Sequence, residues 1–145
     1  MMRDKLGLFG EDKNDLTLIN KLLDWMKSNN ADYTNTFCHL MGVELDDEIY
    51  KNDDFKNWYN EWQKRLKLNN SSNKHLELMK KNNPVVIPRN HKVEEALTDA
   101  DKGNLKTMNK FLKVISNPYS VQENIIEFQK PVPISDEKYQ TFCGT

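Results

Sequence analysis

The sequence predicts an all-α protein: an irregular bundle of about six helices followed by a mostly irregular C-terminal tail. Three observations support this fold class. Apolar residues recur at spacings of three and four along most of the chain, which is the period of an amphipathic helix. Proline, glycine and paired asparagines separate these stretches, as is typical of helix ends. No pair of alternating segments flanks a short turn, so we expect no β-hairpin.

The chain is expected to start with the end of a helix. Residues 1–8 have a helical pattern that Gly7 and Gly10 stop. A chain that begins inside a helix suggests that an upstream segment is missing. The apolar side chains near this start have no preceding element to pack on, so we expect them to face solvent or a neighbouring molecule. These side chains are Leu6, Leu8 and Phe9.

Two amphipathic helices are expected next. The first covers residues 14–28 and ends at Asn29 and Asn30. Its predicted apolar stripe consists of Leu16, Ile19, Leu22, Leu23 and Met26. Asp32 is a suitable N-cap for the second, which Gly42 ends. The apolar side of this second helix carries Tyr33, Phe37, Leu40 and Met41, with Cys38 as a small buried hydrophobe.

The middle of the chain is expected to contain an acidic loop and an aromatic helix. Residues 44–54 are interpreted as a loop with one helical turn, after which Asp53 or Asp54 caps a helix that extends to about Leu68. A shorter helix is expected over residues 72–81. The aromatic helix places its core candidates at helical spacing: Phe55, Trp58, Tyr59, Trp62 and Leu66.

A rigid polar corner is predicted after this shorter helix. Pro84 and Pro88 each fix φ and remove a donor, so residues 85–87 are interpreted as a buried extended linker. Asn90 is predicted to be the N-cap of the following helix. Arg89 is either a buried anchor that donates to helix carbonyls or a ligand-binding residue. Arg89 and Asn90 together form the predicted structural corner.

Two helices are expected beyond the corner, followed by the tail. The first ends at Gly103, and Asn104 caps the second. Their apolar faces carry Val93, Ala96, Leu97 and Ala100 in the first and Met108, Phe111, Leu112 and Ile115 in the second. We therefore expect a helical domain over residues 1–118 and an extended tail over residues 119–145 that carries Cys143.

Composition limits the classes of protein that this chain can represent. The net charge of −1 argues against a general polyanion binder, and hence against a nucleic-acid partner. No apolar run approaches the ~18 residues of a membrane span, and the first residues lack the apolar segment of a signal peptide. Two cysteines do not make a secreted disulfide framework. We expect a cytoplasmic protein without a membrane partner.

No motif forms a complete catalytic site. His39, His75 and His91 are scattered rather than placed at metal-ligand spacing. The five glycines are isolated from one another, so the chain has no glycine-rich phosphate loop. We therefore expect no catalytic, cofactor-binding or metal-binding residue in this chain.

Two features leave alternatives open. Trp58 and Trp62 precede a basic stretch, residues 64–92, that has eight lysines and arginines and one acid. These aromatics either bind single-stranded nucleic acid or belong to the core, which their helical spacing favours. Cys143, third from the end, is either a redox thiol that can reach a partner or an incidental residue.

Short motifs in a fixed order extend over nearly the whole chain. They are Met2-Arg3-x-Lys5-Leu6-Gly7-Leu8; Asp32-Tyr33-Thr34 with Phe37 and Leu40; Trp62 with Arg65-Leu66; Asn83-Pro84, Arg89-Asn90, Ala96, Ala100 and Gly103; Asn117-Pro118-Tyr119; and Cys143. In their order and spacing they resemble the C-terminal region of the SelO/YdiU family, the selenoprotein O pseudokinases.

The resemblance implies a parent protein with a kinase-like fold that binds ATP and Mg²⁺. Members of this family transfer AMP from ATP to protein Ser, Thr or Tyr hydroxyls. Their nucleotide-binding and catalytic residues precede the region matched here, so this chain alone is expected to be inactive. The family's near-terminal cysteine, thought to pair with a cysteine of the kinase-like domain, corresponds to Cys143.

The chain is therefore interpreted as the C-terminal helical region of a SelO-like protein adenylyltransferase. It is expected to support the kinase-like lobe and to carry a redox tail cysteine. Its expected partners are the missing kinase-like domain or another protein, and an exposed apolar face is expected to favour self-association. The alternative is a stand-alone helical module that binds a protein or nucleic-acid partner.

Overall fold

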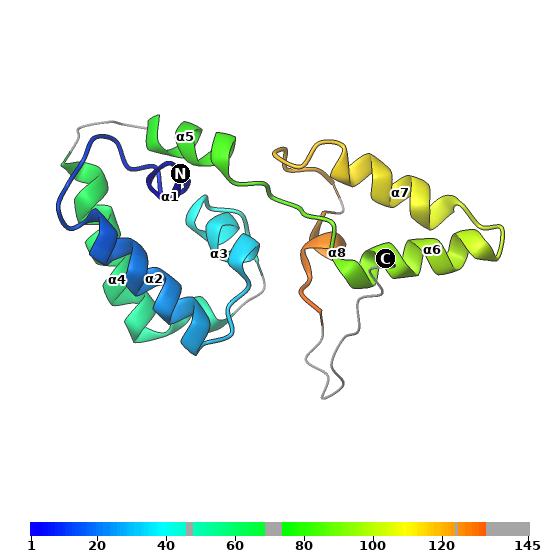
Figure 1. The fold of residues 1–145 in the computed structure, drawn as a ribbon, viewed down its shortest axis with the longest axis horizontal. Coiled ribbons are helices and arrows are strands. Elements are labelled where there is room, and N and C mark those ends of the chain that lie inside the picture. The colour runs from blue at the N-terminus through cyan, green and yellow to red at the C-terminus, as the bar shows by residue number, and fades with distance from the viewer. Residues whose placement is uncertain (46–47, 69–73, 124, 133–145) are drawn as a thin grey trace, which may run out of the picture. The chain divides into compact units, whose positions relative to one another are not determined.

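The computed structural model describes residues 1–132 except 46–47, 69–73 and 124. The described residues form helices and no strand, and six of their eight α-helices are eight residues or longer (Figure 1). The predicted all-α fold is therefore confirmed. No helix in the described part of the chain combines the length and apolar character needed to cross a membrane.

The chain divides into two compact units, Met1–Val85 and Val86–Thr145. We call them the N-terminal unit and the C-terminal unit. The predicted boundary at residue 118, between a helical domain and a tail, stays a prediction because residues 133–145 lie outside the described residues. Cys143 falls in that same segment.

The N-terminal unit packs its helices around an aromatic core. Its elements are α1 (Met2–Lys5), α2 (Asp15–Ser28), α3 (Tyr33–Leu40), the 3₁₀ turn η1 (Glu48–Lys51), α4 (Asp53–Lys67) and α5 (Lys74–Asn82). Helix α4 packs against α2 and η1, and α1 packs against α5 and α2. The indole N–H of Trp58 donates to the Leu18 carbonyl (2.8 Å), and that of Trp62 donates to the Leu6 carbonyl (2.9 Å). Both tryptophans therefore belong to the core.

Burial of the first residues differs from the prediction. Leu6 and Leu8 are buried within the N-terminal unit, and only Phe9 is partly exposed. The expectation of exposed apolar side chains at the start of the chain is therefore wrong for these two leucines. The reason is that α1 packs on α5 and that the Leu6 carbonyl accepts the Trp62 hydrogen bond, so later elements supply the missing neighbours.

Two details of the predicted helices are also corrected. Leu16 is 67% exposed, because the buried face of α2 centres on Leu18, Leu22 and Trp25, on the opposite side of the helix. Helix α4 is capped by Asn52, whose Oδ1 accepts the Phe55 amide at 2.9 Å, rather than by Asp53 or Asp54. These two acids instead lie in the first turn, where a negative charge suits the helix dipole. The Asp32 cap of α3 is confirmed.

The C-terminal unit is a helical hairpin with a short third helix. Its elements are α6 (Asn90–Asp101), α7 (Lys106–Ile115) and α8 (Ile126–Gln129). Helices α6 and α7 pack against each other, and the rings of Phe111 and Phe128 bring α7 and α8 together. The Val86 amide donates to the Pro118 carbonyl, which joins the two ends of the hairpin.

Candidate functional site

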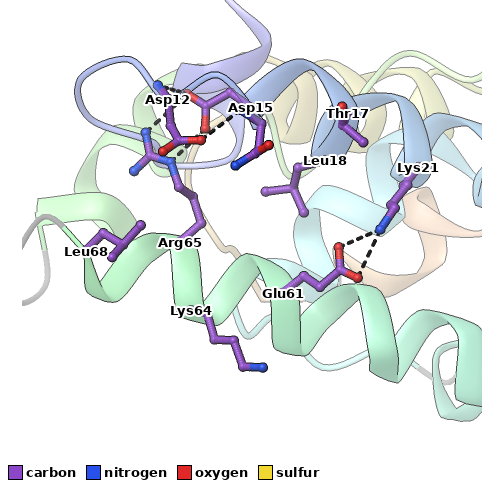
Figure 2. Close-up of a pocket in the computed structure, with 10 residues that line it drawn as sticks. Asp12, Asp15, Thr17, Leu18, Lys21, Glu61, Lys64, Arg65 and Leu68 are labelled. Carbon is purple, nitrogen blue, oxygen red and sulfur yellow. Dashed lines mark hydrogen bonds and ion pairs between the residues drawn. The ribbon is translucent and has the colours of Figure 1, made fainter.

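A buried ion pair joins the start of α2 to the end of α4. Arg65 Nε donates to Asp15 Oδ1 at 2.7 Å, and Arg65 Nη2 donates to Asp15 Oδ2 at 3.1 Å (Figure 2). The same Nη2 donates to the Phe9 carbonyl at 3.0 Å. Both charged residues are more than nine-tenths buried. The pair therefore fixes α2, α4 and the loop between α1 and α2 in one geometry.

Several donors keep the Asp15 carboxylate ionised. Burial by itself would raise the pKa of Asp15, because it removes water from the charged form. Hydrogen bonds from Arg65 and from the Asp12 amide, together with the charges of Arg65 and Arg3, outweigh burial and lower the pKa below its ordinary value. This pair was not predicted from the sequence, because an acid in the first turn of a helix usually serves only the helix dipole.

The ion pair lies at one end of a pocket of about 420 Å³ between α2 and α4. At the other end, Lys21 Nζ pairs with the Glu61 carboxylate at 2.8 Å (Figure 2). The pocket is lined by Asp12, Asn14, Asp15, Thr17, Leu18, Lys21, Glu61, Lys64, Arg65 and Leu68. Its lining contains no cysteine or histidine, and most of its charges already pair with each other. Two ion pairs thus join α2 to α4 at this pocket.

A second buried polar cluster holds α1 against the end of α5. Asn83 Nδ2 donates to the carbonyls of Lys5 (2.8 Å) and Met79 (2.9 Å). Lys5 Nζ donates to the Asn82 carbonyl (2.9 Å) and to Asn83 Oδ1 (3.3 Å), and burial lowers the pKa of this lysine. Asn83 stands directly after α5 and before Pro84, a position typical of a helix end. Its buried amide shows a second role, as a hydrogen-bonded link between segments 78 residues apart.

The predicted structural corner is only partly as expected. Arg89 is buried and stands at the N-cap position of α6, where its carbonyl accepts the amides of Lys92 and Val93. Asn90 is exposed and is the first residue of the helix, and α6 has no side-chain cap hydrogen bond. The predicted Asn90 cap is therefore wrong. The helix starts one residue earlier than the capping pattern indicates, so the asparagine side chain points to solvent.

The remaining candidates are divided between the two units. His39 and His75 belong to the N-terminal unit and His91 to the C-terminal unit, and no cluster of metal-ligating side chains occurs in the part of the chain that the structure describes. Cys38 is buried, with its sulfur 3.7 Å from the Val85 carbonyl. Cys143 lies outside the described residues, so its redox role stays a prediction.

Together, the fold and these clusters define an all-helical module held by buried polar links. A family model described as protein adenylyltransferase SelO matches residues 1–116. The chain therefore belongs to the SelO family.

Curated relatives agree with this assignment. Protein nucleotidyltransferase YdiU of Pelagibacter ubique is 54% identical over 147 residues, which cover all of this chain and 30% of the relative. The proteins of the same name from Clostridium perfringens and Nitrosococcus oceani are each 46% identical and are also covered to 30%. The chain thus spans about a third or less of the length of these relatives.

Proposed function

We propose that the chain acts as the C-terminal helical region of a SelO-like protein adenylyltransferase. In this role it supports a kinase-like lobe in the cytoplasm and carries a redox-active Cys143. ATP and Mg²⁺ bind to the kinase-like part, which transfers AMP to protein hydroxyls. The chain by itself supplies no nucleotide site.

One observation carries this proposal. The similarity to the Pelagibacter relative extends over all of this chain but over only 30% of the relative. The named activity of the relative, nucleotidyl transfer to protein, therefore belongs to a chain about three times as long. A piece of that size contributes to the activity through packing and positioning, for which its buried polar links are suited.

The packing of the N-terminal unit supports a positioning role. The Asp15–Arg65 pair, the Trp62–Leu6 hydrogen bond and the Lys5–Asn83 link each join segments at least 50 residues apart in the chain. Such links make a rigid support, because each fixes two elements by directional contacts in a dry environment.

An adenylylation assay tests the proposal. The chain alone, incubated with α-labelled ATP, Mg²⁺ and a test protein, is expected to transfer no label, and the full-length Pelagibacter relative serves as positive control. A chimera in which this chain replaces the matching 147 residues of that relative is expected to keep the transfer. Label transfer by the chain alone, or a folded chimera without transfer, would contradict the proposal.

The proposed redox role of Cys143 has its own test. A thiol reagent is expected to modify Cys143 rapidly in the native chain and buried Cys38 only on unfolding. Under mild oxidation we expect a thiol or an intermolecular disulfide at Cys143, identified by peptide mapping without reductant. A bond between Cys38 and Cys143 would instead show that the chain is a redox unit complete in itself.

A further inference from the structure

Helix α8 covers one face of the α6–α7 hairpin. The Glu127 carboxylate of α8 pairs with Lys110 of α7 and lies 3.8 Å from Lys92 of α6. The hydrogen bond from Lys110 lowers the pKa of Glu127 and so keeps this bridge charged at neutral pH. Helix α8 therefore lies on the side of the hairpin that carries Lys92 and Lys110.

The side of the hairpin turned away from these lysines carries exposed apolar residues, and no helix lies over them in the described part of the C-terminal unit. At 100° per residue, Leu97 is about 140° around α6 from Lys92, and Leu112 is about 160° around α7 from Lys110. Leu97 and Leu112 are 50% and 47% exposed, and Leu105 at the turn is 56% exposed. The same face also carries the half-buried Val93, Ala100, Met108 and Ile115. We call this set the leucine face.

Isolated exposed leucines are common on protein surfaces, but the residues of the leucine face are neighbours along each helix. Val93, Leu97 and Ala100 follow one another at spacings of four and three on α6, and Met108, Leu112 and Ile115 do so on α7. Two adjacent helices thus present the same kind of stripe on the same side. A contiguous apolar face of this kind marks a contact surface.

We propose that the leucine face is the docking surface for the remaining part of a SelO-family protein, an inference that rests on the proposed function. About 70% of each relative lies outside the region that this chain covers, so a SelO-family protein has a long remaining part that can cover this face. Both helices of the hairpin lie inside the family match, which ends at residue 116.

The edge of the leucine face indicates the chemistry of its partner surface. Glu94 and Asp101 are exposed and lie three residues before and four residues after Leu97, so they border the leucine on the outer side of α6. The complementary surface therefore has an apolar centre with lysine or arginine at the edge that meets α6.

Cysteine labelling tests the docking surface. Leu97→Cys and Leu112→Cys are made with Cys143→Ser, and each is labelled in this chain and in the full-length chimera with the Pelagibacter relative. We expect both cysteines to react freely in the chain alone and about tenfold or more slowly in the chimera, since docking must open before they react. Lys113→Cys, exposed on another side of α7, should react equally in both proteins.

Two other outcomes overturn the proposal. Equal labelling of the two leucine positions in both proteins means that the partner binds elsewhere. Slow labelling in the chain alone means that the face is already occupied: by a second copy if the rate depends on concentration, or by another part of this chain if it does not. Ala96→Cys, at a fully buried position, should stay protected in both proteins and reports misfolding.

If the chimera misfolds, the docking surface can still be tested. The same substitutions at the aligned positions of the full-length relative repeat the comparison without a chimera, with the same expected rates. Adenylyl transfer is measured in a separate assay, so failure of the docking surface can be distinguished from failure of the proposed function. Protected leucines without transfer contradict the proposed function, and accessible leucines with transfer contradict only the docking surface.

Discussion

Asp15 and Arg65 illustrate how a buried charge is tolerated in this small domain. Removing water from a carboxylate is costly, and the attraction of a single cation seldom compensates by itself. Asp15 also accepts the Asp12 amide, and Arg65 also donates to the Phe9 carbonyl, so both partners are satisfied beyond their mutual contact. The pair is therefore expected to fix geometry more than to add net stability.

Removing one partner of the Asp15–Arg65 pair should destabilise the fold more than replacing both partners with apolar residues. Arg65→Met leaves a buried carboxylate without its main partner and is expected to lower the free energy of unfolding by about 3–5 kcal/mol. Arg65→Met with Asp15→Leu should recover most of that loss. Lys21→Ala, which breaks an exposed pair with Glu61, should cost less than about 1 kcal/mol. Urea denaturation measures all three, and equal losses in the single and double variants would refute this view.

The lowered pKa of Asp15 predicts how the stability of the fold changes with pH. Because the folded state binds the proton more weakly than the unfolded chain, Asp15 stabilises the fold above the unfolded pKa of about 3.9. That stabilisation is lost as pH falls from this value through the folded pKa. Asp15→Asn should therefore be less stable than the parent at pH 7 and lose less stability between neutral and acid pH. Parallel stability curves for the two proteins would contradict the assignment.

Asn83 and Asn90 form a matched pair of asparagines near the corner. Asn83→Ala removes a buried amide with three hydrogen bonds and should lower the free energy of unfolding by about 1–3 kcal/mol. Asn90→Ala should change it by less than about 0.5 kcal/mol, because that side chain is exposed and caps nothing. Thermal melting of the two variants decides the point, and a larger loss at Asn90 would restore the predicted cap.

At the scale of elements, the contact between α1 and α5 depends on a glycine. Gly7 has φ of +68°, a backbone region that suits glycine. A Cβ added there would lie 2.8 Å from the His75 carbonyl oxygen, so the backbone of α5 fills the space that a side chain would need. The short helix α1 can therefore approach α5 only where no side chain intervenes.

Gly103 supplies the control for this contact. It has a similar φ of +81°, but no atom lies within 4 Å of an added Cβ. Gly103→Ala should therefore lower the free energy of unfolding only through backbone strain, by about 1–2 kcal/mol. Gly7→Ala should lower the free energy of unfolding by clearly more, because the added Cβ would also collide with the backbone of α5. Equal losses of stability in denaturant unfolding would mean that α5 moves away at little cost.

The positions of the helices were easier to predict from the sequence than the contacts between distant segments. The periods of apolar residues, together with glycine, asparagine and proline at the ends, identified the long helices of the described residues, because those signals are local. The burial of Leu6, Asp15 and Asn83 was not predicted, because their partners lie 50 to 78 residues away in the chain. Asn90 shows a smaller failure, in which a good capping residue lies one position inside the helix.

At the scale of the whole molecule, the two units have unequal cores. Among the described residues of the C-terminal unit, the buried apolar ones are few: Val86, Ala96, Phe111, Val114, Ile125 and Phe128. The N-terminal unit buries the large aromatic set of Trp25, Phe37, Tyr50, Phe55, Trp58 and Trp62. Because buried apolar area is the main source of stability, the C-terminal unit is expected to open more readily.

Hydrogen exchange checks this difference. Amides of α6 and α7 should exchange faster than those of α2 and α4 under native conditions, because opening the smaller core costs less free energy. In the full-length chimera the amides of α6 and α7 should become slower, since docking adds buried area to the hairpin. Equal opening free energies for both units in this chain would show that they unfold together.

The distant partners of α1 also set an order for synthesis. The Leu6 carbonyl meets Trp62 56 residues later, and Lys5 meets Asn83 78 residues later. At about 5–20 residues per second, a ribosome needs roughly 4–16 s between making Lys5 and making Asn83. Leu6 lacks Trp62 until 56 residues later, and α1 has no complete α5 to pack on until Asn83 is made. Nascent chains that stall before residue 83 should therefore be bound by chaperones, and α1, although it is translated before the other helices of its unit, should be the last of them to dock.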